Sequence, residues 1–132
     1  MKGYLLDTGV FLFSMGQEEK LNREARTILE EAENDLFLSA ASSWEISIKW
    51  TLGKLKLPEA ASTYVPKRLT SQGIRSLPIT HLHALMAGEL PAQHQDPFDR
   101  MLIAQAIGEG LVLMTTDRLL EKYGLQTFWC GT

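Results

Sequence analysis

Residues 98–117 read FDRMLIAQAIGEGLVLMTTD, and this stretch decides the fold class. Its first half carries apolar side chains at Phe98, Leu102 and Ala106, a spacing of four that predicts a helix from 98 to 108 with one apolar face. Its second half contains the continuous apolar run 111–114, which is typical of a strand buried on both faces of a parallel sheet. A helix followed by such a strand is the repeating unit of α/β proteins.

The same alternation of helices and short strands extends over the rest of the chain. Further strands are predicted at 3–6, 36–38, 76–79 and 127–129, the third of them at a sheet edge because of Pro78. Further helices are predicted at 18–33, 39–52, 58–69 (with a kink or break at Pro66), 80–90 and 117–123. We therefore expect a single α/β domain, residues 1–132, built around a short, mostly parallel sheet.

Composition and charge exclude several classes of protein. Apolar residues make up 45% of the 132 residues and charged residues 22%, as in ordinary globular proteins, which excludes a disordered chain. A single cysteine cannot form an internal disulfide, so a cytoplasmic location is expected, and no apolar run approaches the length of a membrane span. The net charge of −3 excludes a globally basic nucleic-acid binder. Six basic residues against one acid between 49 and 75 leave open a local phosphate-contacting face.

Acidic residues follow two of the predicted strands. Asp7 comes directly after strand 3–6, and Asp117 closely follows strand 111–114. If both strands are parallel and central, both carboxylates point into the crevice beyond the carboxyl ends of the sheet, where such folds bind ligands. Each carboxylate could instead serve only as the N-cap of the helix that follows it.

Three further acids belong to predicted helices. Asp96 is a natural N-cap before Pro97, which leaves Asp99 in the first turn free to reach over the strand ends. Glu45 borders an apolar stripe that we expect to be buried, formed by Ala41, Trp44, Ile48 and Leu52. The alternative for Glu45 is an exposed ion pair with Lys49, four residues along the same helix.

A cluster of four carboxylates needs a cation to relieve its repulsion. Oxygen donors without paired cysteine or histidine spacing favour Mg²⁺ or Mn²⁺ over zinc, and Thr8 and Thr115 could orient a carboxylate or a metal-bound water. His94 lies close enough in sequence to Asp96 to line the site, but we do not rank it as a ligand. Carboxylate-bound Mg²⁺ is suited to phosphoryl chemistry, and without a glycine-rich phosphate loop the phosphate is expected to belong to a polynucleotide.

Four segments of the chain resemble PIN-domain ribonucleases, specifically the VapC-like toxins of bacterial toxin–antitoxin pairs. They are LLDT at 5–8, SWEISIK at 43–49 with LGKLKLP at 52–58, HQDPFDRMLIAQA at 94–106, and MTTD at 114–117. The resemblance implies a PIN-like three-layer α/β/α sandwich and a metal site formed by Asp7, Glu45, Asp99 and Asp117, with Thr115 in support.

The resemblance also implies an activity and partners. We expect an endoribonuclease that hydrolyses RNA with a water activated by Mg²⁺ or Mn²⁺, forms a homodimer and is blocked by an antitoxin protein. One alternative is a catalytically silent PIN-fold binding module, although all four acids are present. A more remote one is a phosphoaspartate receiver or phosphatase, but a phosphatase needs a second aspartate two positions after Asp7, where this chain has Gly9.

Overall fold

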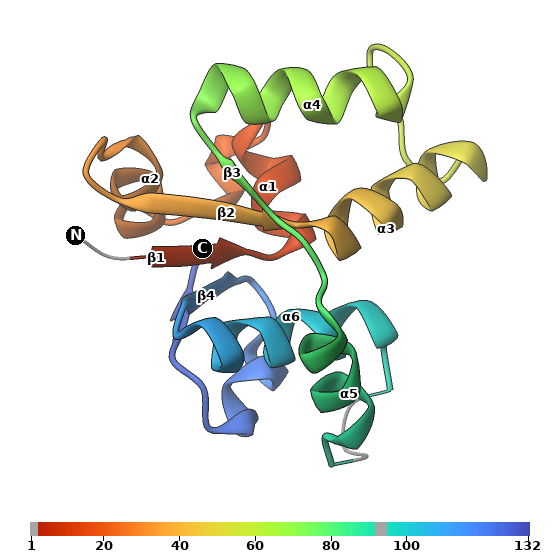
Figure 1. Cartoon of the computed structure of the whole chain (residues 1–132). Coiled ribbons are helices and arrows are strands. Elements are labelled where there is room, and N and C mark those ends of the chain that lie inside the picture. Colours follow the sequence, from red (N-terminus) through yellow and green to blue (C-terminus); the bar gives the residue numbers. More distant parts are fainter. Residues whose placement is uncertain (1–2, 92–94) are drawn as a thin grey trace.

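The computed structural model describes residues 3–91 and 95–132, and its centre is a sheet of parallel strands. Within the described residues, five strands lie in the order β3-β2-β1-β4-β5 (Figure 1). Their bounds are β1 Gly3–Leu6, β2 Asp35–Ser39, β3 Arg75–Leu77, β4 Val112–Thr115 and β5 Thr127–Trp129. The predicted strands are therefore confirmed, with β3 at an edge as Pro78 suggested.

The register of the sheet brings three strand ends level with one another. Leu6 of β1 pairs with Leu38 of β2 on one side and with Met114 of β4 on the other. The residues that follow each of these, Asp7, Ser39 and Thr115, therefore lie along one edge of the sheet. The two acid-bearing strands predicted to be parallel and central are indeed adjacent, since β1 lies at the centre and β4 beside it.

Helices cover both faces of the sheet, which confirms the three-layer α/β/α sandwich. Successive residues of β1 face opposite layers: Tyr4 and Leu6 pack in one apolar core, and Leu5 packs in the other with residues of α6. Figure 1 shows α1, α2 and α4 on one side and α5 and α6 on the other. The helix bounds are α1 Thr8–Ser14, α2 Arg23–Glu30, α3 Ala40–Thr51, α4 Ala61–Gln72, α5 His81–Glu89 and α6 Pro97–Glu109.

Two helix predictions need correction in their extent. The helix expected at 18–33 is divided into a short 3-10 helix, η1 (Glu18–Lys20), and α2. Asn22 divides it: its backbone N–H donates to Cys130 O at 2.8 Å, and its side chain caps Ala25 N at 2.8 Å while donating to Trp129 O. The helix expected after Asp117 is the 3-10 helix η2 (Arg118–Tyr123). α4 continues through Pro66.

The buried stripe predicted for α3 is also wrong in part. Trp44 is 63% exposed and Leu52 is 62% exposed, whereas Ala41, Ser42 and Ile46 are buried. The α3 surface that faces the core is therefore rotated from the predicted one, because a buried hydroxyl contact between Ser42 and Thr8 of α1 replaces apolar packing at this point. Within the described ranges, no helix has the length and apolar character that crossing a membrane requires.

Candidate active site

Asp7 is a buried carboxylate at the carboxyl edge of the sheet. Its side chain is fixed on both oxygens: Oδ1 accepts the Val10 N–H at 2.7 Å, and Oδ2 accepts the Thr115 hydroxyl at 2.5 Å. The first contact makes Asp7 the N-cap of α1, so the capping interpretation holds. The second contact joins the ends of β1 and β4, which leaves the carboxylate in one orientation towards the crevice.

Burial raises the pKa of Asp7 to about 6. Hydrogen bonds from Thr115, Val10 and Thr116 counteract this effect, and the nearby charge of Asp99 adds to it. Asp7 and Asp99 therefore interact electrostatically although they come from different elements. Such a carboxylate keeps its charge most easily when a cation lies beside it.

Glu45 on α3 is connected to this edge through a hydroxyl. The Thr8 hydroxyl donates to Glu45 Oε1 at 2.7 Å and lies 2.9 Å from Ser42 Oγ. The other oxygen of Glu45, Oε2, accepts from Lys49 Nζ at 2.8 Å, so the predicted i,i+4 ion pair is present as well. The Glu45 side chain is only 12% exposed. It is thus a positioned carboxylate next to the residue that follows Asp7, not a solvated surface group.

Asp96 is the cap of α6, as predicted, and Asp99 follows it in the first turn. Asp96 Oδ1 accepts the N–H groups of Phe98 at 2.9 Å and Asp99 at 3.1 Å, so Asp96 caps α6. Asp99 lies in the first turn and acts electrostatically on two neighbours, since its charge raises the pKa of Asp7 and, after larger effects from Glu45 and burial, that of Lys49. The charge of Asp99 therefore acts on residues of both the β1 end and α3.

Asp117 is held near the site but its side chain is used locally. Its backbone N–H donates to Thr115 Oγ1 at 2.9 Å, and its Oδ1 caps η2 by accepting the Leu119 N–H at 2.9 Å. Thr115 therefore connects the backbone of Asp117 to the carboxylate of Asp7.

The donor set fits a hard divalent cation through few direct contacts. Within the described ranges, no three His, Cys, Asp or Glu side chains are grouped closely enough to hold a metal by themselves. Mg²⁺ usually keeps several waters and binds proteins through one or two carboxylates. Asp7 and Asp99, which interact electrostatically, supply two such carboxylates. His94 lies outside the described residues.

Sequence reasoning missed the role of Arg100 and of two aromatic rings. Arg100 donates to carbonyl oxygens at the end of α5, those of Ala87, Gly88, Leu90 and Pro91, at 2.7–3.3 Å. Trp44 and Phe98 meet edge-on with ring centroids 5.3 Å apart. The sequence offered one signal for these residues, their position beside a predicted acid. Phe98 and Arg100 flank Asp99, and Trp44 precedes Glu45.

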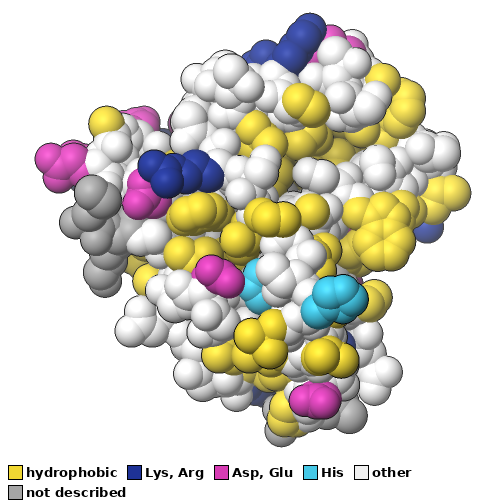
Figure 2. Space-filling view, in the orientation of Figure 1, with side chains coloured by type: hydrophobic (Ala, Val, Ile, Leu, Met, Phe, Trp, Pro, Cys, Tyr) yellow, Lys and Arg dark blue, Asp and Glu magenta, His cyan; other side chains and the backbone are white. Residues whose placement is uncertain are grey.

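The basic stretch between 49 and 75 is partly neutralised. Lys49, Lys67 and Arg75 form ion pairs with Glu45, Glu59 and Asp35 respectively. Figure 2 shows instead a band of apolar side chains between α4 and α5 on the face viewed, with Lys and Arg at its margins. The structure therefore does not display a continuous cationic face along this stretch in that view.

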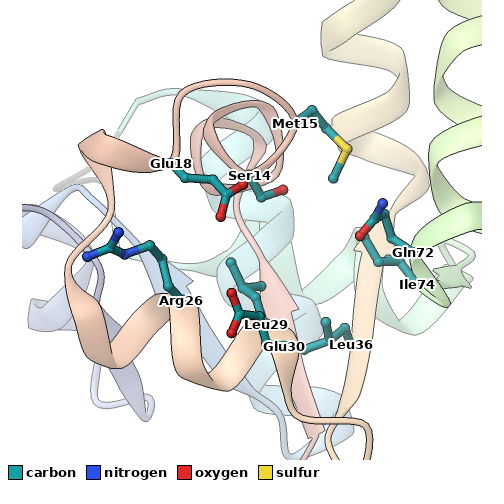
Figure 3. A pocket seen from close by; sticks show the side chains of 9 residues that line it. All are labelled: Ser14, Met15, Glu18, Arg26, Leu29, Glu30, Leu36, Gln72 and Ile74. Atoms are coloured by element: carbon teal, nitrogen blue, oxygen red, sulfur yellow. The ribbon is translucent and has the colours of Figure 1, made fainter.

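A cavity of about 220 Å³ lies elsewhere in the molecule (Figure 3). Its lining includes Met15 at the end of α1, Leu36 near the start of β2 and Ile74 just before β3. It therefore lies towards the amino ends of the strands, and no predicted site residue lines it. The candidate site lies instead at the carboxyl edge of the sheet, where Asp7 and Thr115 follow the ends of β1 and β4.

An open parallel sheet with a fixed carboxylate at its carboxyl edge defines an α/β protein whose ligand site lies beyond the strand ends. Within this class, the chain belongs to the PIN domain family, whose model matches residues 4–125. The family assignment confirms the resemblance that the four sequence segments indicated.

Relatives and solved structures agree with this assignment. Ribonuclease VapC16 of Mycobacterium tuberculosis is 45% identical over 60 residues, which is 46% of this chain and less than half (43%) of that protein. Ribonuclease VapC22 of the same organism is 29% identical over 124 residues, 93% of each chain. VapBC2 from Rickettsia felis, bound to a promoter DNA fragment, has a TM-score of 0.73 at 16% identity, covering 97% and 98% of the two chains. A toxin–antitoxin complex from Klebsiella pneumoniae has a TM-score of 0.65 at 16% identity, covering 95% of each.

Proposed function

We propose that this chain is a VapC-like endoribonuclease toxin that hydrolyses phosphodiester bonds in RNA with Mg²⁺ or Mn²⁺. One observation carries the proposal: Asp7 is a buried carboxylate whose pKa is raised to about 6 and which feels the charge of Asp99 at the carboxyl edge of the sheet. Folding retains this electrostatic cost, as is common at functional sites. The names of the relatives, Ribonuclease VapC16 and VapC22, support the choice of RNA.

The cation would be held by Asp7 and Asp99, with Glu45 and Asp117 acting on its water ligands. When bound, it would supply an activated water and stabilise charge on the phosphate in an in-line displacement. Thr115 fixes the orientation of Asp7 through the 2.5 Å hydrogen bond, and Thr8 fixes that of Glu45 through the 2.7 Å hydrogen bond. Lys49 neutralises Glu45 from the solvent side through their ion pair.

The proposal includes partners and a location. The Klebsiella structure is named a toxin–antitoxin complex, and we propose that this chain also binds an antitoxin protein, which blocks its activity. We also propose that it forms a homodimer and works in the cytoplasm. The exposed apolar side chains Leu82 and Leu85 on α5 support a protein contact, because contiguous apolar patches mark interaction sites.

The experiment is cleavage of total cellular RNA by the purified chain, whose purity is checked by mass spectrometry to exclude bound antitoxin. We expect discrete new 5′ ends with Mn²⁺ or Mg²⁺, none with EDTA, and none with Asp7→Asn or Asp99→Asn. Glu24→Gln is the matched control, since Glu24 is an exposed carboxylate in the first turn of α2. Equal cleavage by wild type and Asp99→Asn would overturn the assignment of the site.

A silent binding module is the second candidate function. It is favoured by one observation: within the described ranges the acids do not form a ready three-ligand group. Calorimetric titration with Mn²⁺ separates the two functions, because a nuclease must bind the ion at millimolar concentration and lose that binding in Asp7→Asn. Absence of binding together with absence of cleavage would favour the module. A phosphoaspartate function would require a stable acyl phosphate on Asp7 after treatment with a small phosphodonor.

A further inference from the structure

Trp44 is an exposed aromatic side chain on α3, the helix that carries Glu45. Its side chain is 63% exposed, although tryptophan is among the side chains that gain most from burial. It directly precedes Glu45 on α3, and Glu45 contacts Thr8 at the start of α1. The indole therefore lies on the same turn of α3 as Glu45 and remains open to solvent.

The orientation of Trp44 is fixed by an aromatic contact across the crevice. Its ring meets that of Phe98 at a centroid distance of 5.3 Å and an interplanar angle of 72°. Phe98 precedes Asp99 on α6, as Trp44 precedes Glu45 on α3. The contact thus joins the two helices that carry acids, and it holds the indole in a defined position relative to both.

The position of Trp44 around the helix places it between Glu45 and a cavity. Residues 100° apart follow one another around an α-helix, so Glu45 lies on one flank of Trp44, and Ser43 and Ser47 lie on the other. These serines line a cavity of about 350 Å³ between α3 and α4, together with Ser62 of α4 and Ser76 of β3. A polynucleotide strand that ran from Glu45 around α3 to this cavity would pass over Trp44.

We propose that Trp44 is a base-stacking subsite for single-stranded RNA, which receives a nucleobase next to the phosphodiester bond that is cut. The proposal rests on the nuclease function proposed above. Single-stranded RNA is recognised through unstacked bases laid on aromatic side chains, and such stacking tolerates every base because each has a π-face. Stacking also suits this place because the neighbouring cation Lys49 is already paired with Glu45.

The test compares an RNA with and without its bases. The probes are a fluorescent 12-nucleotide RNA of alternating adenosine and cytidine and an abasic oligomer with the same sugar–phosphate backbone. Binding is measured by anisotropy in the Asp99→Asn background with Mg²⁺, so that no cleavage occurs. Trp44→Ala should weaken binding of the RNA about fivefold or more and leave the abasic oligomer unaffected, since one stacked base contributes about 1–3 kcal/mol. Trp44→Phe should recover most of the loss.

Trp50→Ala is the matched control, because Trp50 is also partly exposed on α3 but lies further along the helix from Glu45. It should bind both oligomers as the parent does. If Trp44→Ala weakens binding of the RNA and of the abasic oligomer equally, the stacking role is wrong. It is also wrong if Trp44→Ala binds RNA normally and changes only the oligomeric state of the protein. If wild type cuts RNA and Trp44→Ala binds and cuts normally, the subsite is wrong and the nuclease function stands. If wild type neither cuts nor binds RNA, both proposals fail.

Discussion

Asp7 links folding to the proposed chemistry through its proton. Because burial raises its pKa to about 6, the folded state binds a proton more tightly than the unfolded state, in which an aspartate titrates near 3.9. The contribution of the Asp7 proton to the free energy of unfolding is therefore present in full below about pH 4, and it is lost as the pH rises to 6 and above. The loss amounts to about 3 kcal/mol once Asp7 is ionised without a cation, given 1.36 kcal/mol for each pKa unit.

Asp7→Asn should remove this penalty. We compare the free energies of unfolding of the variant and of wild type in EDTA, measured by urea denaturation at pH 4 and at pH 8. The difference between variant and wild type should be about 3 kcal/mol more in favour of the variant at pH 8 than at pH 4. Added Mg²⁺ should stabilise wild type at pH 8 and leave the variant unchanged, because binding to the folded state alone adds stability. Glu24→Gln serves as the control. Parallel pH profiles for wild type and Asp7→Asn would contradict the raised pKa.

The candidate site could be predicted in part because it follows from strand ends. Asp7 and Thr115 are 108 residues apart, yet a parallel register between two apolar strands places them level, and the sequence shows both strands. The side-chain partners could not be predicted in the same way. That Thr8 connects to Glu45 depends on rotamers and helix orientation, for which local spacing carries no information. The cap that Asp117 forms with the Leu119 N–H was open to prediction, because capping is local.

At the scale of elements, α5 is attached to α6 at both of its ends. His83 near its start lies 2.8 Å from Glu109, through Nε2 and Oε2, and the Arg100 guanidinium binds the carbonyl oxygens at its end. The sequence predicted both helices from their caps, Thr80 and Asp96, because capping is local. It could not predict this attachment, nor the exposed side of α3, because α3 has apolar side chains on several sides and only tertiary contacts select the buried one.

Arg100→Lys should therefore destabilise the protein although it keeps the charge. A single ammonium cannot reach the carbonyls that the planar guanidinium binds together, so we expect a loss of about 2 kcal/mol in urea denaturation. Hydrogen exchange should rise first in α5. Arg75→Ala is the control, because its ion pair with Asp35 is exposed and should contribute at most about 1 kcal/mol. An unchanged free energy of unfolding in Arg100→Lys would show that water satisfies these carbonyls equally well.

At the scale of the whole molecule, exposed leucine side chains on α5 bear on how the protein assembles. The α5 surface presents Leu82 at 67% and Leu85 at 62% exposure, and beside them lies a cavity of about 360 Å³ that Met86, Leu90 and Pro91 also line. Apolar patches of this kind mark protein contacts, and in closed symmetric dimers the same patch on two copies meets itself.

The proposed homodimer should accordingly depend on α5. We expect the wild-type chain to have twice its mass of 14.8 kDa in sedimentation equilibrium, and Leu85→Glu to shift it to the monomer, because a buried unpaired carboxylate on each side of a two-fold contact is costly. Leu119→Glu is the matched control, since Leu119 is 53% exposed on η2, away from α5. It should remain a dimer. Circular dichroism should show both variants folded, as their side chains are exposed in the monomer. A dimer that survives Leu85→Glu would place the contact on another surface.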